Sequence, residues 1–468
     1  MQNEISNTTK KILLTIMIVG CFFSTLNQTL LNVALSDLME IFNVTANKIQ
    51  WLATGFMLVN GVLVPLTAYL MKRFSTRQLF IASMLFLLIG SIISACAVNF
   101  SMLLTGRMIQ AAGAGIIIPL MMTVILYLYD QDQRGAVMGK IGFAIIFAPA
   151  IATTVAGFML DYVSWRWLFI MMIPITIIII ILAYMYLGNV SETKKAKLDM
   201  ASVLLSTIGF GLVLYGFSSA GSRGWTDAIV LGTIIIGLLF IAFFCMRQLR
   251  STEPLLNLNV FKYKMFTMTS LVNILVTILM YADLILLPMY LQTGRGFSAF
   301  EAGLLLLPGA IINAFLSPVT GKLYDRVGAK PLFLIGMALI AVSMWMVTDL
   351  SATTSFTYVM LRTIVLRIGL SFITMPLNTA ALNALPLELG SHGSAVNNTV
   401  RQLAGAVGTA VIVTIFSLQT TAHLDQQQLA PILGANDTYE FMFILSILAL
   451  ILILFVPKEV KRKGTTTK

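Results

Sequence analysis

The stretches Ile173–Leu187 (IPITIIIIILAYMYL) and Phe441–Val456 (FMFILSILALILILFV) decide the fold class, because neither contains a charged residue. Each approaches the roughly 20 apolar residues that a helix rising about 1.5 Å per residue needs to cross about 30 Å of hydrocarbon. The whole chain of 468 residues follows this pattern, with 58% hydrophobic and 10% charged residues. A soluble domain carries about 25% charged residues. We therefore expect an all-α polytopic membrane protein.

Apolar runs along the chain predict fourteen membrane spans, with boundaries uncertain by a few residues. The predicted spans are residues 12–35, 50–71, 79–98, 102–127, 137–160, 167–187, 199–220, 228–246, 266–291, 301–320, 331–349, 355–378, 398–418 and 439–456. Two polar loops, Gly188–Asp199 and Arg247–Lys264, divide these spans into six, two and six. The predicted units are residues 1–190, an inserted pair at 191–250, and residues 251–468 with a short tail.

The positive charges indicate the orientation in the membrane. Of the 30 Lys and Arg residues, 23 fall in alternate loops that include both termini, and only four fall in the other loops. The positive-inside rule therefore predicts a multi-pass protein of the plasma membrane with both termini in the cytoplasm. Although the net charge is +11, the cations lie in short clusters between apolar runs and form no basic face, so we expect no nucleic-acid partner.

Enzymatic and metal chemistry have little support in the sequence. No phosphate-binding GxxxxGK[ST] loop occurs, and no nucleophile, base and orienting residue recur together. Cys21, Cys96 and Cys245 all lie in apolar segments, which argues against disulfides and metal clusters. His392 and His423 are predicted in loops on opposite sides, too far apart to share a metal. We expect no catalytic site and no cofactor other than a coupled proton.

Short motifs recur once in each six-helix block, which is typical of a duplicated transporter. GKLYDRVGAK (Gly321–Lys330) has a degenerate first-half counterpart in AYLMKRFSTR (Ala68–Arg77). LLTGRMIQAAGAG (Leu103–Gly115) and GFAIIFAPAIATTVAG (Gly142–Gly157) complete the set. With fourteen spans, the chain resembles the drug:H⁺ antiporters of the major facilitator superfamily, near the lincomycin-resistance exporters.

The resemblance implies functional roles for two of these motifs. The expected cytoplasmic gate consists of Gly321, Asp325, Arg326, Gly328, Lys330, Lys72 and Arg73. Asp325 is expected to cap a neighbouring helix and to form ion pairs between the bundles in one state of a rocking transporter. The alternative is a solvated turn that only sets topology. The expected antiporter helix carries Gly142, Pro149 and Gly157.

Charged residues inside spans are the candidates for proton coupling, because they are costly in a membrane. They are Asp283, Arg362, Arg367 and Arg107, with Glu301 in reserve near an outer helix end. If the halves are repeats, Asp283 corresponds to the region of Asn27, and Arg362 to Arg107. An apolar environment favours the protonated acid and a nearby arginine the deprotonated one, so rocking would exchange a proton. The alternative is a static buried Asp–Arg pair.

A second group of residues is predicted to line a substrate cavity: Asn27, Gln28, Asn32, Gln110, Met280 and Tyr281. For the amides, hydrogen bonding between helices is the competing interpretation. Met and aromatic side chains suit a site that accepts different ligands. Asn27 itself cannot carry a proton.

These features predict a proton-coupled antiporter that exports lipophilic or cationic drugs by alternating access. The expected partners are amphipathic small molecules and the lipid bilayer, and the expected oligomeric state is a monomer. A dedicated exporter of a lipid, siderophore or amino acid is the first alternative. A membrane sensor or scaffold that does not transport is the second.

Overall fold

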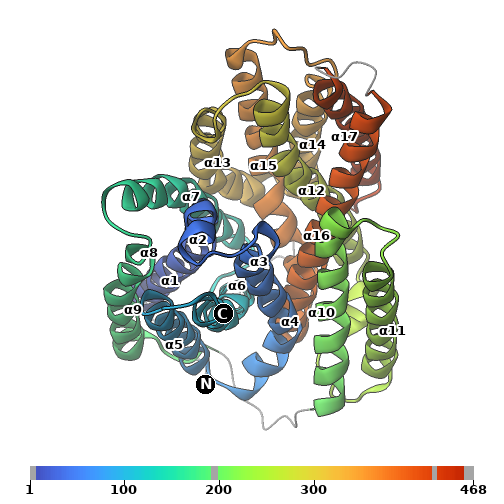
Figure 1. The fold of residues 1–468 in the computed structure, drawn as a ribbon. Helices are drawn as coiled ribbons and strands as arrows, with labels where there is room; N and C mark the ends of the chain where they lie inside the picture. The colour runs from blue at the N-terminus through green and yellow to red at the C-terminus, as the bar shows by residue number, and fades with distance from the viewer. Residues whose placement is uncertain (1–6, 191–198, 424–428, 458–468) are drawn as a thin grey trace.

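A computed structural model describes residues 7–190, 199–423 and 429–457, and the described chain is helical, without strands. Figure 1 shows two groups of helices side by side, with a third, smaller group beside them. The first half contains α1 (Asn7–Val33), α2 (Leu35–Ile41), α3 (Ala46–Ile49), α4 (Trp51–Arg73), α5 (Thr76–Ala95), α6 (Phe100–Leu128), α7 (Arg134–Tyr162), α8 (Trp167–Ile170) and α9 (Met172–Tyr186).

The inserted pair consists of α10 (Met200–Arg223) and α11 (Ala228–Arg250). The second half contains η1 (Leu258–Lys262), α12 (Lys264–Met289), η2 (Tyr290–Gly294), α13 (Ala299–Val327), α14 (Ala329–Trp345), α15 (Phe356–Asn383), η3 (Leu387–Leu389), α16 (Gly390–Ala422) and α17 (Ala430–Leu454).

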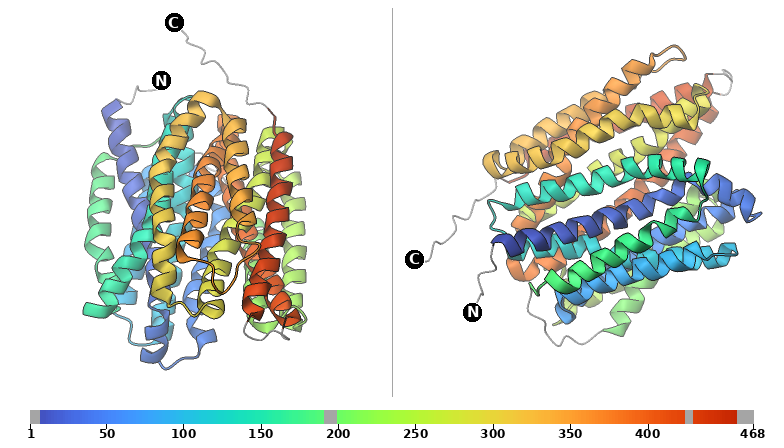
Figure 2. Two further views of the ribbon diagram at one scale, coloured as in Figure 1. Left: turned by 90° about the horizontal axis from the view of Figure 1, so that it is seen from above. Right: turned by 90° about the vertical axis from the view of Figure 1, so that its left-hand side faces the viewer.

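The prediction of fourteen spans in a six, two and six arrangement is confirmed. Thirteen helical segments of the described chain are long and apolar enough to cross a membrane, and α8 and α9 together form one of them. The shorter apolar helix α14 is the fourteenth. In Figure 2, α1 begins and α17 ends at the same end of the bundle, as an even number of spans requires. We call this the proximal end and the opposite one the distal end.

Local sequence sets several helix starts. Ser75 and Gln78 form a capping box at the start of α5, and Ser298 and Glu301 form another at the start of α13. The Asn99 side chain accepts a hydrogen bond from the Met102 amide (2.8 Å) at the start of α6. Such caps satisfy backbone N–H groups that have no partner within the helix, so short polar residues between apolar runs mark where spans begin.

Three boundaries differ from the predicted ones by about two turns of helix. The predicted spans 301–320, 398–418 and 439–456 correspond to α13, which continues to Val327, α16, which begins at Gly390, and α17, which begins at Ala430. The added turns are polar, yet many of their side chains are buried against other helices. For example, Asn436 of α17 both donates to and accepts from the Leu350 backbone, each at 2.9 Å. Hydropathy misses such turns because other helices, not lipid, satisfy them.

The inserted pair packs on the seam where α4 of the first half meets α16 of the second (Figure 1). Gly61 of α4 lies against Leu214 of α10, so that a Cβ atom there would collide with the leucine side chain. On the other side of the seam, the Trp225 indole donates a hydrogen bond to the Thr414 hydroxyl of α16. The pair therefore contacts both halves.

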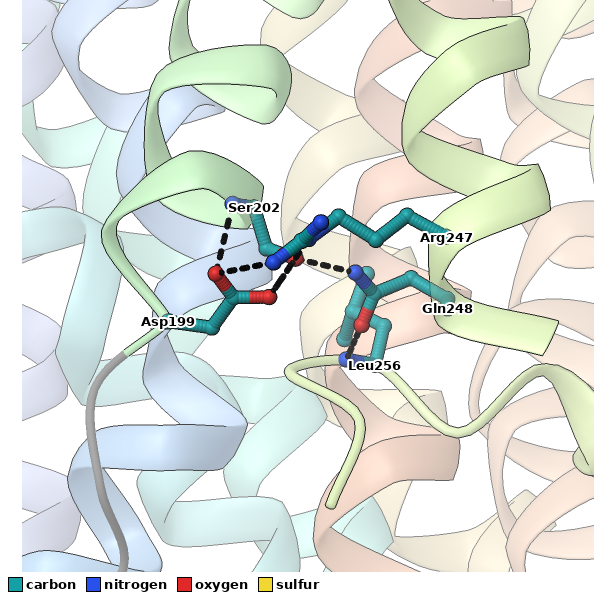
Figure 3. A network of polar contacts seen from close by, with 5 residues as sticks. All are labelled: Asp199, Ser202, Arg247, Gln248 and Leu256. Carbon is teal, nitrogen blue, oxygen red and sulfur yellow. Dashed lines mark hydrogen bonds and ion pairs between the residues drawn. The ribbon is translucent and has the colours of Figure 1, made fainter. Parts of the chain in front are cut away.

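A polar network fixes the proximal ends of α10 and α11 to each other (Figure 3). Arg247 donates two hydrogen bonds to the Asp199 carboxylate, at 2.7 and 3.0 Å. Gln248 donates to the Ser202 hydroxyl (2.7 Å) and accepts from the Leu256 amide (3.2 Å), which ties the following linker to the pair. Hydrogen bonding to Arg247 holds the pKa of the Asp199 carboxyl well below its ordinary value.

Candidate functional site

Arg107 on α6 forms the centre of a buried polar cluster in the first half, and only 1% of its surface is exposed. It donates to the backbone and side-chain oxygens of Asn27 (3.1 Å each), to Gln110 (3.1 Å) and to the Gln28 carbonyl (3.3 Å). The Phe56 ring lies 4.5 Å from the guanidinium carbon. Every partner is neutral, and among the described residues no carboxylate lies within ion-pair distance of Arg107.

Small residues allow the helices around Arg107 to pack closely against each other. A Cβ atom at Gly90 of α5 would lie 2.6 Å from the Gly106 carbonyl of α6, so the two helices touch backbone to backbone. Close contact brings Gln110 within 2.9 Å of the Ser91 hydroxyl, to which its amide donates. Asn27 and Gln110 therefore form hydrogen bonds between helices. This is the alternative that the sequence left open beside a role in lining a substrate cavity. The side chain of Asn32 lies outside the described residues.

Arg362 on α15 forms the corresponding centre in the second half, and it is fully buried. Its guanidinium makes an ion pair with Asp283 of α12 and donates to the Ser343 carbonyl of α14 (3.0 Å). The Tyr439 hydroxyl of α17 donates to Asp283 Oδ1 at 3.3 Å. The predicted meeting of Asp283 with Arg362 is therefore present.

One oxygen of the Asp283 carboxylate is left without a partner. Asp283 is 1% exposed and is the only buried carboxylate among the described residues. Oδ1 receives the hydrogen bonds from Arg362 and Tyr439, whereas Oδ2 has no hydrogen-bond partner. A buried acceptor without a donor is costly, and a carboxylate oxygen in this position can bind a proton without breaking an existing bond.

The two centres occupy equivalent positions in the duplicated halves. Arg107 lies 80 residues after Asn27, and Arg362 lies 79 residues after Asp283. Each arginine projects from the fourth span of its half onto the first span. The two centres differ in several partners, and the difference in charge lies at one position, where an amide in the first half is replaced by a carboxylate in the second.

Arg367, the other predicted coupling residue on α15, makes no ion pair among the described residues but lies within electrostatic range of Asp283 and Arg362. A Cβ atom at Gly309 of α13 would lie 2.9 Å from Arg367 Cγ, so its aliphatic stem packs on the neighbouring helix. Its Nε has no hydrogen-bond partner. Glu301 lies at the exposed start of α13, where Ser298 holds it in the capping box. Glu301 is thus separate from both centres.

The halves meet at the proximal end through Asp325. Its two carboxylate oxygens accept from the Gly135 and Ala136 amides, at 2.8 and 2.7 Å. These amides belong to the first turn of α7, so Asp325 caps a helix of the other half, as predicted. Gly321 lies so close to Gly135 that a Cβ atom on it would collide with the Gly135 backbone. Glycine is therefore needed at both positions.

Other residues of the predicted gate have different places from those expected. Gly321 was expected in a turn, but it lies inside α13, and only Gly328 adopts the left-handed backbone (φ 81°) that ends this helix. Lys330 donates to the Leu454 carbonyl (2.6 Å) at the end of α17, a contact within the second half. Lys72 and Arg73 form the last turn of α4. Lys72 lies within electrostatic range of His392 in the first turn of α16.

The contact between α7 and α13 is close in the proximal part of these helices. Ser317 donates to the Gly139 carbonyl (3.0 Å), and a Cβ atom at Gly142 would collide with Ser317 and Met375. Phe315 packs edge-on against Phe143, with ring centroids 5.5 Å apart. Further along α7, beyond Pro149, Gly157 has nothing within 4 Å of its Cβ position. The closed contact between the halves thus lies at the proximal end.

The predicted cavity residues of α12 face the second half. A Cβ atom at Gly405 of α16 would lie 3.2 Å from the Tyr281 ring, and Met280 packs on the buried core of this half. These positions agree with packing roles at the contact between α12 and α16.

The positive-inside count places Arg401 among the cytoplasmic cations, near the start of the predicted span 398–418. Because α16 begins at Gly390, Arg401 lies inside this helix and becomes the fourth arginine within a span. The same extension places His392 in a helix, where its Nδ1 accepts from the Asn257 amide (3.1 Å). The signal was the four-residue spacing of Gly390, Ser394 and Asn398, which puts small and polar residues on one helical face. Without Arg401, the count of loop cations falls from 23 to 22 (23 − 1) of 30.

Two six-helix halves, an inserted pair, and charged centres buried inside spans define a polytopic membrane transporter. The Major Facilitator Superfamily model matches residues 17–409, and the chain belongs to this family. The human organic anion transporter MFSD10 shares the fold, with a TM-score of 0.70, 13% identity, and coverage of 95% of this chain and 99% of that one. A double-tryptophan mutant of XylE gives a TM-score of 0.71 at 16% identity, with 98% of each chain covered.

Relatives in sequence confirm the resemblance to the fourteen-helix drug-transporter branch. The uncharacterized MFS-type transporter YhcA of Bacillus subtilis is 46% identical, over 88% of this chain and 78% of the relative. The lincomycin resistance protein LmrB of the same organism is 40% identical, over 87% of this chain and 85% of the relative. The multidrug export protein EmrB of Haemophilus influenzae is 26% identical, over 89% and 82%.

Proposed function

We propose that this protein is a proton-coupled antiporter that exports lipophilic or cationic drugs by alternating access. The observation that carries the proposal is Asp283, a buried carboxylate inside a span that is paired with Arg362 and has one free oxygen. A buried ionisable group of this kind in a membrane transporter is a candidate for ion coupling. The names of LmrB and EmrB support drugs as the substrates.

The closed contact at the proximal end supports alternating access. Asp325, Gly321 and Ser317 hold α13 against α7 there. The charge distribution favours a cytoplasmic proximal end and insertion in the plasma membrane. We therefore infer that this arrangement is the outward-facing state, and that rocking of the halves breaks the Asp325 cap to reach the inward-facing state.

Proton exchange follows from the pairing of Asp283. While Arg362 contacts the carboxylate, the charge of Asp283 is balanced and no proton is needed. When α12 shifts relative to α15 within the second half and withdraws the arginine, an unpaired buried carboxylate is strongly disfavoured, and uptake of a proton removes its charge. A cationic drug bound to the deprotonated carboxylate would also neutralise the charge of Asp283. Proton and drug would therefore compete for one site.

The driving force is sufficient for one proton per drug molecule. A membrane potential of about 100 mV is worth about 2.3 kcal/mol per charge, which corresponds to roughly a forty-fold concentration ratio. The proposal therefore includes a proton as the coupling ion and no other cofactor. It also includes a monomer in the lipid bilayer, with amphipathic small molecules as ligands and no nucleic-acid partner.

The test is a measurement of drug-dependent proton movement with the purified protein in liposomes that contain a pH-sensitive dye. A panel of lipophilic and cationic drugs should cause proton flux in the direction opposite to drug movement, and Asp283→Asn should abolish it. Drug transport without proton flux would contradict coupling. Transport of a single lipid, siderophore or amino acid with no response to drugs would favour the dedicated exporter, and no transport at all would favour a sensor or scaffold.

A further inference from the structure

Arg401 lies where the two halves and the inserted pair meet. Its helix, α16, packs against α12 and α17 of the second half, α4 and α6 of the first half, and α10. In Figure 1, α16 accordingly occupies the middle of the molecule. Of the neighbours of Arg401 on α16, Gln402 donates to the Asn60 side chain of α4 (3.3 Å), whereas Gly405 packs on Tyr281 of α12. Arg401 is therefore positioned between elements of opposite halves.

The face of α16 that carries Arg401 is directed toward the first half. One and two turns before it, Asn398 and Ser394 are buried, and Ser394 donates to the Pro119 carbonyl of α6 at 3.2 Å. Arg401 is also within electrostatic range of Cys21 on α1. Its side chain nevertheless remains partly exposed. A charge within a span is expected to face the bundle interior or an aqueous cavity.

Arg401, like Arg367, has few strong partners, in contrast to the arginines of the two buried centres. Among the described residues, Arg401 donates a single hydrogen bond, to the Asn398 side-chain oxygen at 3.2 Å. In the described part of the chain, no carboxylate lies within ion-pair distance of it. Arg107, in contrast, has four neutral acceptors, and Arg362 has Asp283. A guanidinium has five N–H donors, so most of the capacity of Arg401 remains available.

The balance of charge inside the spans also favours an anionic partner for Arg401. Four arginines lie within spans, at 107, 362, 367 and 401, and the single buried carboxylate of the described residues is already paired with Arg362. This interior has an excess of positive charge. A planar guanidinium with free donors binds a carboxylate in a two-bond arrangement that an amide or an amine cannot reproduce.

We propose that Arg401 is a specificity-determining residue that binds the anionic oxygen group of an amphipathic substrate between the halves. The inference rests on the proposed export function and extends its substrate range to acids and zwitterions. Asn398 contacts the guanidinium, and Gln402, which follows Arg401 on α16, bonds to Asn60 of α4, so amide groups of both halves lie on this part of α16. A zwitterion would place its anionic group at Arg401 and leave Asp283 to cations and protons.

The experiment uses three dansyl probes that differ in charge: dansyl-leucine (an acid), dansyl-leucinamide (neutral) and dansyl-ethylenediamine (an amine). Binding is measured by fluorescence with the full-length protein in nanodiscs of zwitterionic lipid, and export is measured in cells that lack their own drug exporters. Arg401→Gln should weaken binding of the acid about tenfold, as expected for loss of a charged hydrogen-bond partner, and leave the neutral probe within about twofold. Arg401→Lys should preserve most of the acid affinity.

Arg295→Gln is the matched control, because Arg295 is a partly exposed arginine at the distal side that donates to the Thr354 carbonyl (2.6 Å). It should leave all three probes unchanged. Equal losses for the acid and the neutral probe in Arg401→Gln would show a structural role and overturn the proposal. Competition by anionic lipid in the nanodiscs, with no export of the acid, would assign the site to a lipid head group and also overturn it. Failure of the wild-type protein to export any probe or drug would instead refute the proposed function.

Discussion

The two arginine centres have the same architecture but differ in charge. Both arginines project from the fourth span of their half onto the first span, and both are buried. Arg107 is bound only by neutral oxygens, whereas Arg362 has Asp283. A neutral amide cannot gain or lose a proton in the relevant range, so the first-half centre has no described side chain that could carry the coupled proton. Under the proposed function, proton exchange is therefore expected in the second half alone.

The contacts between the halves show the same asymmetry. In the second half, Asp325 caps the start of α7, where a negative charge is favourable. In the first half, the corresponding residue of the motif is Lys72, near the start of α16. A cation there is unfavourable toward the positive end of the helix. One half thus carries both the acid inside the membrane and the acid at the gate.

The largest effect is expected when the second-half centre is converted to the chemistry of the first. Asp283→Asn should abolish proton-driven export, because the amide cannot take up a proton, and should destabilise the protein by about 3–5 kcal/mol through the unpaired charge of Arg362. Thermal unfolding and liposome transport measure the two effects separately. The double variant Asp283→Asn with Arg362→Gln should recover stability but not coupling. If well-folded Asp283→Asn still exchanges drug for protons normally, proton exchange does not depend on the second-half carboxylate. The proposed difference between the two centres would then be wrong.

A smaller effect is expected at the gate. Asp325→Asn should slow export several-fold while drug binding and protein amount stay close to normal, because loss of a charged cap costs about 1 kcal/mol and shifts the balance between states. Transport rate and equilibrium binding are the two measurements. Lys72→Asp, the matched change in the first half, should alter the rate less. The reverse order would mean that the first-half contact is the dominant gate.

The opposite change, which introduces a carboxylate into the first-half centre, tests the same comparison. Asn27→Asp would place a carboxylate at the position whose oxygen is 3.1 Å from Arg107 Nη1. The new charged hydrogen bond should stabilise the protein by about 1–2 kcal/mol, seen as a higher midpoint of thermal unfolding. Export should continue, since Asp283 is intact. A loss of stability would indicate that the first-half centre has no room for a second charge.

The smallest effect is expected at the Asp199–Arg247 ion pair, which lies outside both halves. Hydrogen bonding to Arg247 lowers the pKa of Asp199 in the folded protein, so its contribution to stability is present above the pKa of the unfolded chain. That contribution is lost as the pH falls through the folded-state value. Because the pair is partly exposed, Asp199→Asn should cost less than about 1 kcal/mol at neutral pH and leave export unchanged. An export defect would give the inserted pair a direct role in transport.

The sequence was sufficient for the main features of the fold. The length and spacing of the apolar runs predicted all fourteen spans, because burial in lipid requires nearly continuous apolar surface. The duplication and the depth of the charges predicted that Asp283 meets Arg362, since an isolated charge in a span must find a partner. The acid at Asp325 and its helix-capping geometry followed from the motif.

The tertiary structure alone decided which polar residues belong to the membrane interior. Hydropathy measures transfer from water to lipid and cannot recognise a polar turn that other helices satisfy. The first two turns of α16, and with them the depth of Arg401 inside this helix, were therefore missed. Hydropathy also could not show that Lys330 caps α17 within its own half. These contacts depend on the relative position of helices far apart in the chain, which is fixed by packing of small residues such as Gly90, Gly106 and Gly321.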